Sequence, residues 1–76
     1  MNAFVSIYFE RQSNSTPTTI LNRISRVTNV KFVNLVTGDM SAIAWVETPD
    51  PEAFRNVVLD INSVNGVDYT YTFYAL

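Results

Sequence analysis

The polar residues best placed to hold a ligand lie in two short stretches, residues 37–41 and 70–72. In the first, backbone N–H groups around Gly38 could form a small concave site for a carboxylate. The side chain of Asp39 could receive an ammonium group. In the second, Thr70 and Thr72 are two residues apart, so on a strand both hydroxyls point to the same face and could reach one ligand. These stretches are the candidates for a small-molecule site.

Each of these features also has a structural explanation. Glycine is the default where the backbone φ angle is positive, aspartate is common in turns, and threonine is a good strand former. The chain has no His and no Cys, so thiolate metal sites, thiol catalysis and the most frequent general base near neutral pH are absent. The acidic residues show no metal-ligand or paired-carboxylate spacing. We therefore predict no catalytic residue, no metal site and no cofactor.

The rest of the sequence predicts the elements that position these residues. Alternating β-branched and aromatic residues predict strands at residues 3–9, 30–37, 40–47 and 67–75. Apolar residues at helical spacing predict helices at residues 17–28 and 51–64, with Thr16 and Asp50 as capping residues, each followed by proline. Asn29 tolerates the left-handed conformation and ends the first helix. Gly38 and Asp39 form a two-residue hairpin loop.

The predicted order is βαββαβ within one domain, residues 1–76. Right-handed crossovers place both helices on one face of a four-stranded antiparallel sheet, so we expect an α+β, ferredoxin-like plait. Neither face of the last two strands is cleanly polar, as in a sheet that is buried on both sides. A chain of this size hides less apolar surface than its 47% hydrophobic residues present. We predict a homodimer or larger homo-oligomer with these interface residues: Ile43, Trp45, Tyr69, Tyr71 and Phe73.

The charge pattern bears on the possible partners. The formal net charge is −2, and the five basic residues are scattered. Nucleic-acid binding depends on a basic patch, so we expect no direct contact with nucleic acid. The N-terminal apolar run is too short and too alternating for a signal peptide or a membrane span. We expect a cytoplasmic protein with no membrane contact.

The second half of the chain resembles a known family. The Val36-Thr37-Gly38-Asp39-Met40-Ser41 turn, a strand ending in Val46-Glu47, a helix, and a strand with Gly66-Val67 and Thr70-Tyr71-Thr72 follow one another. That order resembles the effector-binding (RAM) domain of the Lrp/AsnC family, a dimeric α+β barrel. The resemblance implies that an amino acid binds between subunits. Ser41 stands where many family members have a second Asp, which removes one negative charge. The implied ligand-binding residues are Gly38, Asp39, Met40, Ser41, Thr70 and Thr72.

The resemblance also implies a function. The first strand begins near residue 3, so we expect a stand-alone module without a helix-turn-helix. It would sense a small-molecule effector and assemble, or it would modulate a full-length Lrp/AsnC-type regulator. One alternative is a small enzyme on a dimeric α+β barrel, and another is a purely structural assembly module. A third is an RNA-binding plait that stacks bases on Tyr8 and Trp45, which the acidic balance opposes.

Overall fold

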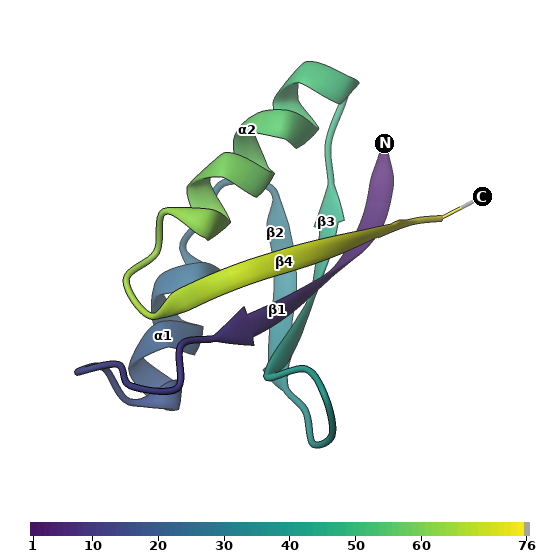
Figure 1. Ribbon diagram of the computed structural model, residues 1–76. Helices are drawn as coiled ribbons and strands as arrows, with labels where there is room; N and C mark the ends of the chain where they lie inside the picture. Colours follow the sequence, from purple (N-terminus) through teal and green to yellow (C-terminus); the bar gives the residue numbers. More distant parts are fainter. Residues whose placement is uncertain (76) are drawn as a thin grey trace.

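Four antiparallel strands and two helices follow the order βαββαβ in the computed structural model, which describes residues 1–75 (Figure 1). The sheet has the strand order β2-β3-β1-β4, so β1 and β3 are central and β2 and β4 are edges. Both helices lie on one face, and the predicted ferredoxin-like plait is confirmed. The elements are β1 (Asn2–Phe9), α1 (Pro17–Ser25), β2 (Val30–Leu35), β3 (Ala42–Glu47), α2 (Pro51–Asn62) and β4 (Val67–Tyr74).

The two helices begin where the sequence predicts and end earlier. The side chains of Thr16 and Asp50 accept hydrogen bonds from backbone N–H groups three residues on, and a proline follows each. Helix α1 ends at Ser25 because the N–H of Arg26 turns to a carbonyl only three residues back. Asn29 has the expected left-handed conformation, with φ of 73°, but it lies in the turn before β2. No helix within residues 1–75 is long and apolar enough to cross a membrane.

The connection between β2 and β3 differs from the predicted two-residue hairpin loop. Strand β2 ends at Leu35 and β3 begins at Ala42, so residues 36–41 form the turn. The hairpin closes with a hydrogen bond from the N–H of Val36 to the carbonyl of Ser41 at 3.1 Å. Ser41 also bonds β1. Its N–H donates to the carbonyl of Ile7 at 2.9 Å, and its hydroxyl accepts from the N–H of Phe9 at 3.0 Å. The end of the turn is therefore held by the central strand as well as by β2.

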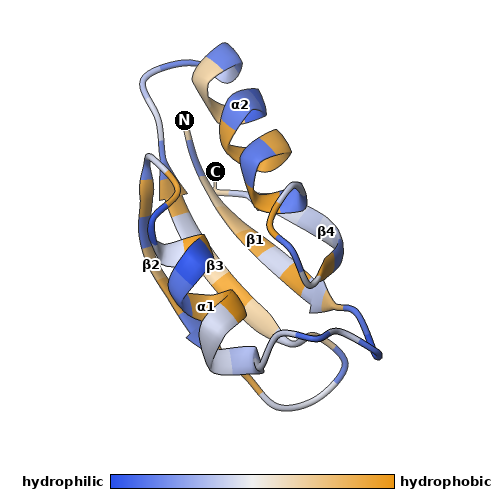
Figure 2. Cartoon of the chain, turned by 90° about the vertical axis from the view of Figure 1, so that its left-hand side faces the viewer, coloured by the Kyte–Doolittle hydropathy of each residue, from blue (hydrophilic) through white to orange (hydrophobic). Residues whose placement is uncertain are grey.

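The core lies between the helices and one face of the sheet. Helix α1 packs on β2 and α2 packs on β4, as seen from the helix side in Figure 2. The inner face of β3 carries Ala42, Ala44 and Val46, all fully buried, and Ile43 and Trp45 point to the other face, as predicted. The buried residues from the other elements are Ala3, Val5, Ile7, Ile20, Ile24, Phe54, Val57, Ile61 and Val67.

The two glycines give a matched test of this packing. Both have positive φ, 104° at Gly66 and 111° at Gly38. A Cβ at Gly66 would lie 2.5 Å from Cδ1 of the buried Ile20, whereas a Cβ at Gly38 meets nothing within 4 Å. We expect both Gly→Ala variants to lose about 1–3 kcal/mol from backbone strain. Overlap with Ile20 should cost Gly66→Ala about 1–3 kcal/mol more.

Thermal and urea unfolding at one protein concentration measures this difference. Equal losses of unfolding free energy in the two variants would contradict the packing of Gly66 against Ile20.

Candidate functional site

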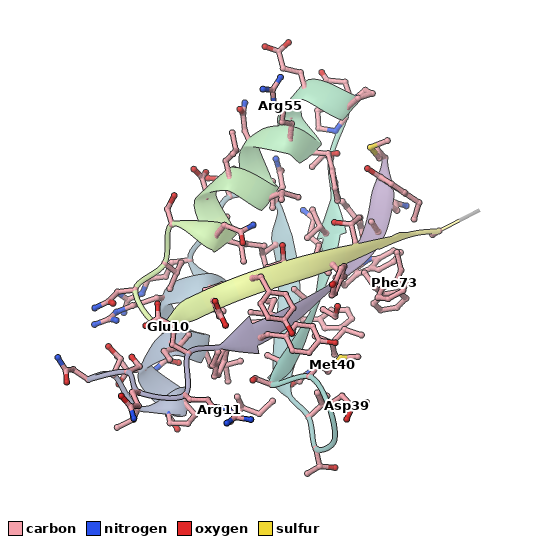
Figure 3. All side chains as sticks on the ribbon, in the orientation of Figure 1. Glu10, Arg11, Asp39, Met40, Arg55 and Phe73 are labelled. Atoms are coloured by element: carbon pink, nitrogen blue, oxygen red, sulfur yellow. The ribbon has the colours of Figure 1, made fainter. Side chains whose placement is uncertain are left out.

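The helix-free face of the sheet carries a dense set of aromatic side chains. Residues directly opposite one another in an antiparallel pair share a face, so the strand register identifies them. Phe4 lies opposite Trp45 on β3 and Phe73 on β4, and Tyr8 lies opposite Tyr69. Phe73 projects away from the helices in Figure 3. The surface, here named the aromatic face, consists of Phe4, Tyr8, Phe32, Ile43, Trp45, Tyr69, Tyr71 and Phe73.

The rings of the aromatic face contact one another but remain open to solvent. The ring centroids of Phe4 and Trp45 are 4.6 Å apart. Tyr8 stacks on Tyr69 at 4.4 Å, and Tyr71 meets both rings edge-on. Even so, Phe4 is 40% exposed and Tyr71 is 58% exposed. Contiguous apolar patches on soluble chains mark interaction sites, and all five predicted interface residues lie on this one.

Two polar groups at the aromatic face already have partners within the chain. The hydroxyl of Ser6, which is almost fully buried, donates to the carbonyl of Tyr71 at 3.2 Å. The indole Nε1–H of Trp45 donates to Oε2 of Glu47 at 2.6 Å. A donor that is buried without a partner costs about 1–3 kcal/mol. An apolar surface could therefore cover this face without leaving Ser6 or Trp45 unpaired.

The pKa of Tyr69 reflects its position on the aromatic face. Desolvation by its neighbours, followed by the nearby Tyr8, Tyr71 and Asp68, raises the pKa of Tyr69 above its usual value. A phenol is neutral at physiological pH even without this shift, which extends the neutral range of Tyr69 to higher pH. A neutral hydroxyl is far less costly to cover than a charged one.

The turn between β2 and β3 forms one wall of a cavity of about 590 Å³, here named the turn cavity. Gly38, Met40 and Ser41, three of the predicted ligand-binding residues, line it. Asp39 is exposed and is not among the lining residues. In Figure 3, Asp39 and Arg11 lie on opposite sides of the turn. Within one chain, the predicted ammonium acceptor is therefore outside the turn cavity.

Two charged residues of the turn cavity were not predicted as site residues. Glu10 and Arg11, which follow β1 directly, line the cavity together with Pro17 from the start of α1. They bring one carboxylate and one guanidinium to its wall, the two groups that recognise a zwitterion. The predicted topology could have identified these two residues, because β1 lies next to β3 and ends beside the turn that precedes β3. Apolar side chains of Phe9, Leu35 and Val36 complete the wall.

The two predicted threonines share a face of β4, as expected, but that face is turned to α2. The hydroxyl of Thr70 accepts from Nδ2 of Asn62 at 3.0 Å. Thr72 lines a separate cavity between α2 and β4. The structure thus brings Gly38, Met40 and Ser41 together and leaves the threonines elsewhere. A site that uses both sets needs the turn of one chain and β4 of another.

Within residues 1–75, no group of three or more acidic side chains gathers where it could hold a metal ion. The turn cavity, with apolar walls and a few charged groups, is suited to binding a small molecule.

Comparison with known proteins gives a consistent picture. A family model described as the Lrp/AsnC ligand binding domain matches residues 2–76. Homocitrate synthase of Sulfurisphaera tokodaii is 32% identical over 72 residues, which are 95% of this chain but 15% of that enzyme. The crystal structure of TTHA0845 from Thermus thermophilus has a TM-score of 0.85 and 30% identity, over 99% of this chain and 91% of that one.

A longer solved structure has the same fold. The transcriptional regulator NMB0573 from Neisseria meningitidis, in complex with L-Met, has a TM-score of 0.82 and 19% identity. The match covers 99% of this chain and 49% of the regulator, so the chain spans about half of that protein's length. At that identity the likeness shows the fold alone.

The hydrogen bonds of Ser41 generate a prediction about the turn. Ser41→Ala leaves the N–H of Phe9 without its acceptor, so we expect a loss of about 1–2 kcal/mol of unfolding free energy. The amide of Phe9 should also exchange faster with solvent. Ser25→Ala is a matched control because its hydroxyl bonds a carbonyl at the exposed end of α1. Unchanged exchange at Phe9 in the Ser41→Ala variant would contradict the assigned bond.

Proposed function

The chain belongs to the Lrp/AsnC ligand-binding domain family, and from this premise we propose that it is an effector-binding regulatory module that works as a homo-oligomer. The aromatic face is the observation that carries this proposal. It supports assembly of the chain with copies of itself, and the turn cavity supports binding of a small effector.

Assembly follows from the one-sided cover of the sheet. Two helices bury the inner face, and the described chain has no further element to cover the outer one. Two copies related by a two-fold axis would stack their aromatic faces, since a self-complementary patch pairs with itself. Stacked sheets pack about 10 Å apart, a distance that aromatic side chains from both sheets fill. Trp45 on the central strand β3 would lie within that contact.

A charge placed on the aromatic face should break the oligomer. We expect Trp45→Glu to raise the dissociation constant at least about a hundredfold, because it removes a large ring and buries a carboxylate. Thr28→Glu is the matched control, since it adds the same charge in the exposed loop after α1. Sedimentation velocity across a dilution series measures both variants. A wild-type chain that is monomeric at micromolar concentration is the contrary result.

The effector site that we propose is the turn cavity, completed between subunits. The amides around Gly38 take a carboxylate, and Asp39 takes the amino group once a neighbouring chain approaches the turn. Met40 and Ser41 line the same wall, and Thr70 and Thr72 would come from β4 of that neighbour. The L-Met in the structure of the Neisseria regulator supports an amino acid as the ligand. The apolar walls of the turn cavity suit an apolar side chain.

The serine at position 41 leads to a prediction about the affinity for amino acids. A carboxylate there would add one charge-assisted hydrogen bond to a ligand amino group, worth about 1.5–3 kcal/mol. We therefore expect Ser41→Asp to bind amino acids about ten- to a hundredfold more tightly than the wild-type chain. Calorimetry with methionine and leucine on both proteins makes the comparison. If neither protein binds either amino acid, the effector site is wrong and a purely structural assembly module is the better account.

The module would act on a larger partner. The chain is similar to part of an enzyme and to about half of a transcriptional regulator. This supports a binding domain that occurs together with different catalytic or regulatory domains. We propose a full-length Lrp/AsnC-type regulator as the partner, joined through the shared sheet-to-sheet contact. The similarity to homocitrate synthase covers 15% of that enzyme, so it supports a shared binding domain rather than shared catalysis.

A further inference from the structure

A second cavity, of about 280 Å³, opens between α2 and β4 and shares no lining residue with the turn cavity. It is lined by Met1, Pro51, Phe54, Arg55, Val58, Leu59, Thr72 and Tyr74, and is here named the α2–β4 groove. Two contacts hold the helix to the strand beside it. The rings of Phe54 and Tyr74 lie 5.6 Å apart within the lining, and Asn62 bonds Thr70 further along α2.

The groove combines apolar walls with a few polar groups, and its lining includes the N-terminal residue Met1 with its ammonium group. Val58 and Leu59 of α2, together with Phe54 and Tyr74, supply apolar surface. Arg55, labelled on α2 in Figure 3, is the charged side chain of the lining. Thr72 adds a half-buried hydroxyl from β4. None of the described residues that line the groove is acidic.

We infer that the α2–β4 groove binds a small monocarboxylate with an apolar, branched tail. The guanidinium of Arg55 presents paired N–H donors that match the two oxygens of a carboxylate. The hydroxyl of Thr72 donates to the same group, and the tail packs on Val58 and Leu59. The volume lies just below the usual range of about 300–1,000 Å³ for drug-sized ligands, which favours a short acid.

The same lining discriminates against amino acids. An α-ammonium group beside the carboxylate would be brought next to Arg55 without an acidic side chain to accept its hydrogen bonds. The two positive charges repel, and the N-terminal ammonium of Met1, which also lines the groove, adds a further positive charge. The groove therefore takes a carboxylic acid that lacks the amino group. This preference is opposite to that of the turn site proposed above.

The groove is complete within a single chain. Its residues come from α2, β4 and the N-terminal Met1, and none belongs to the aromatic face. Thr72 is the residue that the groove shares with the proposed effector site. The effector site needs two chains and the groove needs one, so a monomeric variant tests the inference separately from the proposed function.

Titration of the amide spectrum with 4-methylpentanoate tests the inference. We expect saturable shifts at residues 54–59 and 72–74, with the turn at 36–41 unmoved. The neutral analogue 4-methylpentanamide lacks the charge, and leucine adds the amino group. Both should bind at least about tenfold more weakly, the effect of losing a charge-assisted hydrogen bond or stranding a charge. Absence of shifts with the acid, or equal affinity for leucine, overturns the inference.

Variants locate the binding groups. Arg55→Gln should lower the affinity for 4-methylpentanoate about tenfold, and Thr72→Val should lower it a few-fold. Each variant should otherwise keep a native spectrum. Lys31→Gln removes an exposed cation from β2 and should leave affinity unchanged. Trp45→Glu should also retain binding. Wild-type affinity in Arg55→Gln, or loss of binding in Trp45→Glu, shows that the site lies elsewhere or needs a second chain, and either result contradicts the inference.

Discussion

The structure depends on a sheet that is apolar on both faces while the chain carries helices for only one. Strands alternate their side chains, so each inner residue of β1, β3 and β4 is flanked by outer ones, and here most of those are aromatic. Helices α1 and α2 bury the inner face. The outer face keeps its rings in contact with water. A small chain with a limited core gains most by covering that surface with another copy.

This constraint also decides where small molecules can bind. If the aromatic face is occupied by a second chain, the remaining hollows lie at the end of the sheet and beside its edge. The turn cavity stands at the end of β1, where Glu10 and Arg11 leave the strand. The α2–β4 groove follows the open edge strand, where Arg55 and Thr72 line the same space. Both hollows are distinct from the aromatic face, so ligand occupancy and assembly can be separated by mutation.

The faces and the caps could be predicted from the sequence because both are local. Alternation over two residues determined the sides of Ala44 and Trp45, and the Thr-Pro and Asp-Pro pairs marked both helix starts. The turn could not be predicted in the same way. Ser41 at its end also bonds a strand more than thirty residues away, and local turn chemistry does not encode that contact. The sequence predicts that Thr70 and Thr72 share a face, but it does not show that this face lies beneath α2. It also does not place Arg11 beside the turn. Both placements follow from the order of the strands in the sheet.

Trp45 is the single tryptophan of the chain, so its fluorescence reports directly on the aromatic face. The most direct measurement is acrylamide quenching of Trp45 across a dilution series, with molar mass followed in parallel by sedimentation. If the aromatic face is the contact between copies, quenching is weak at high concentration and rises on dilution with the same midpoint as the fall in mass. Quenching that stays constant while the mass falls would place the contact on another surface and contradict the account.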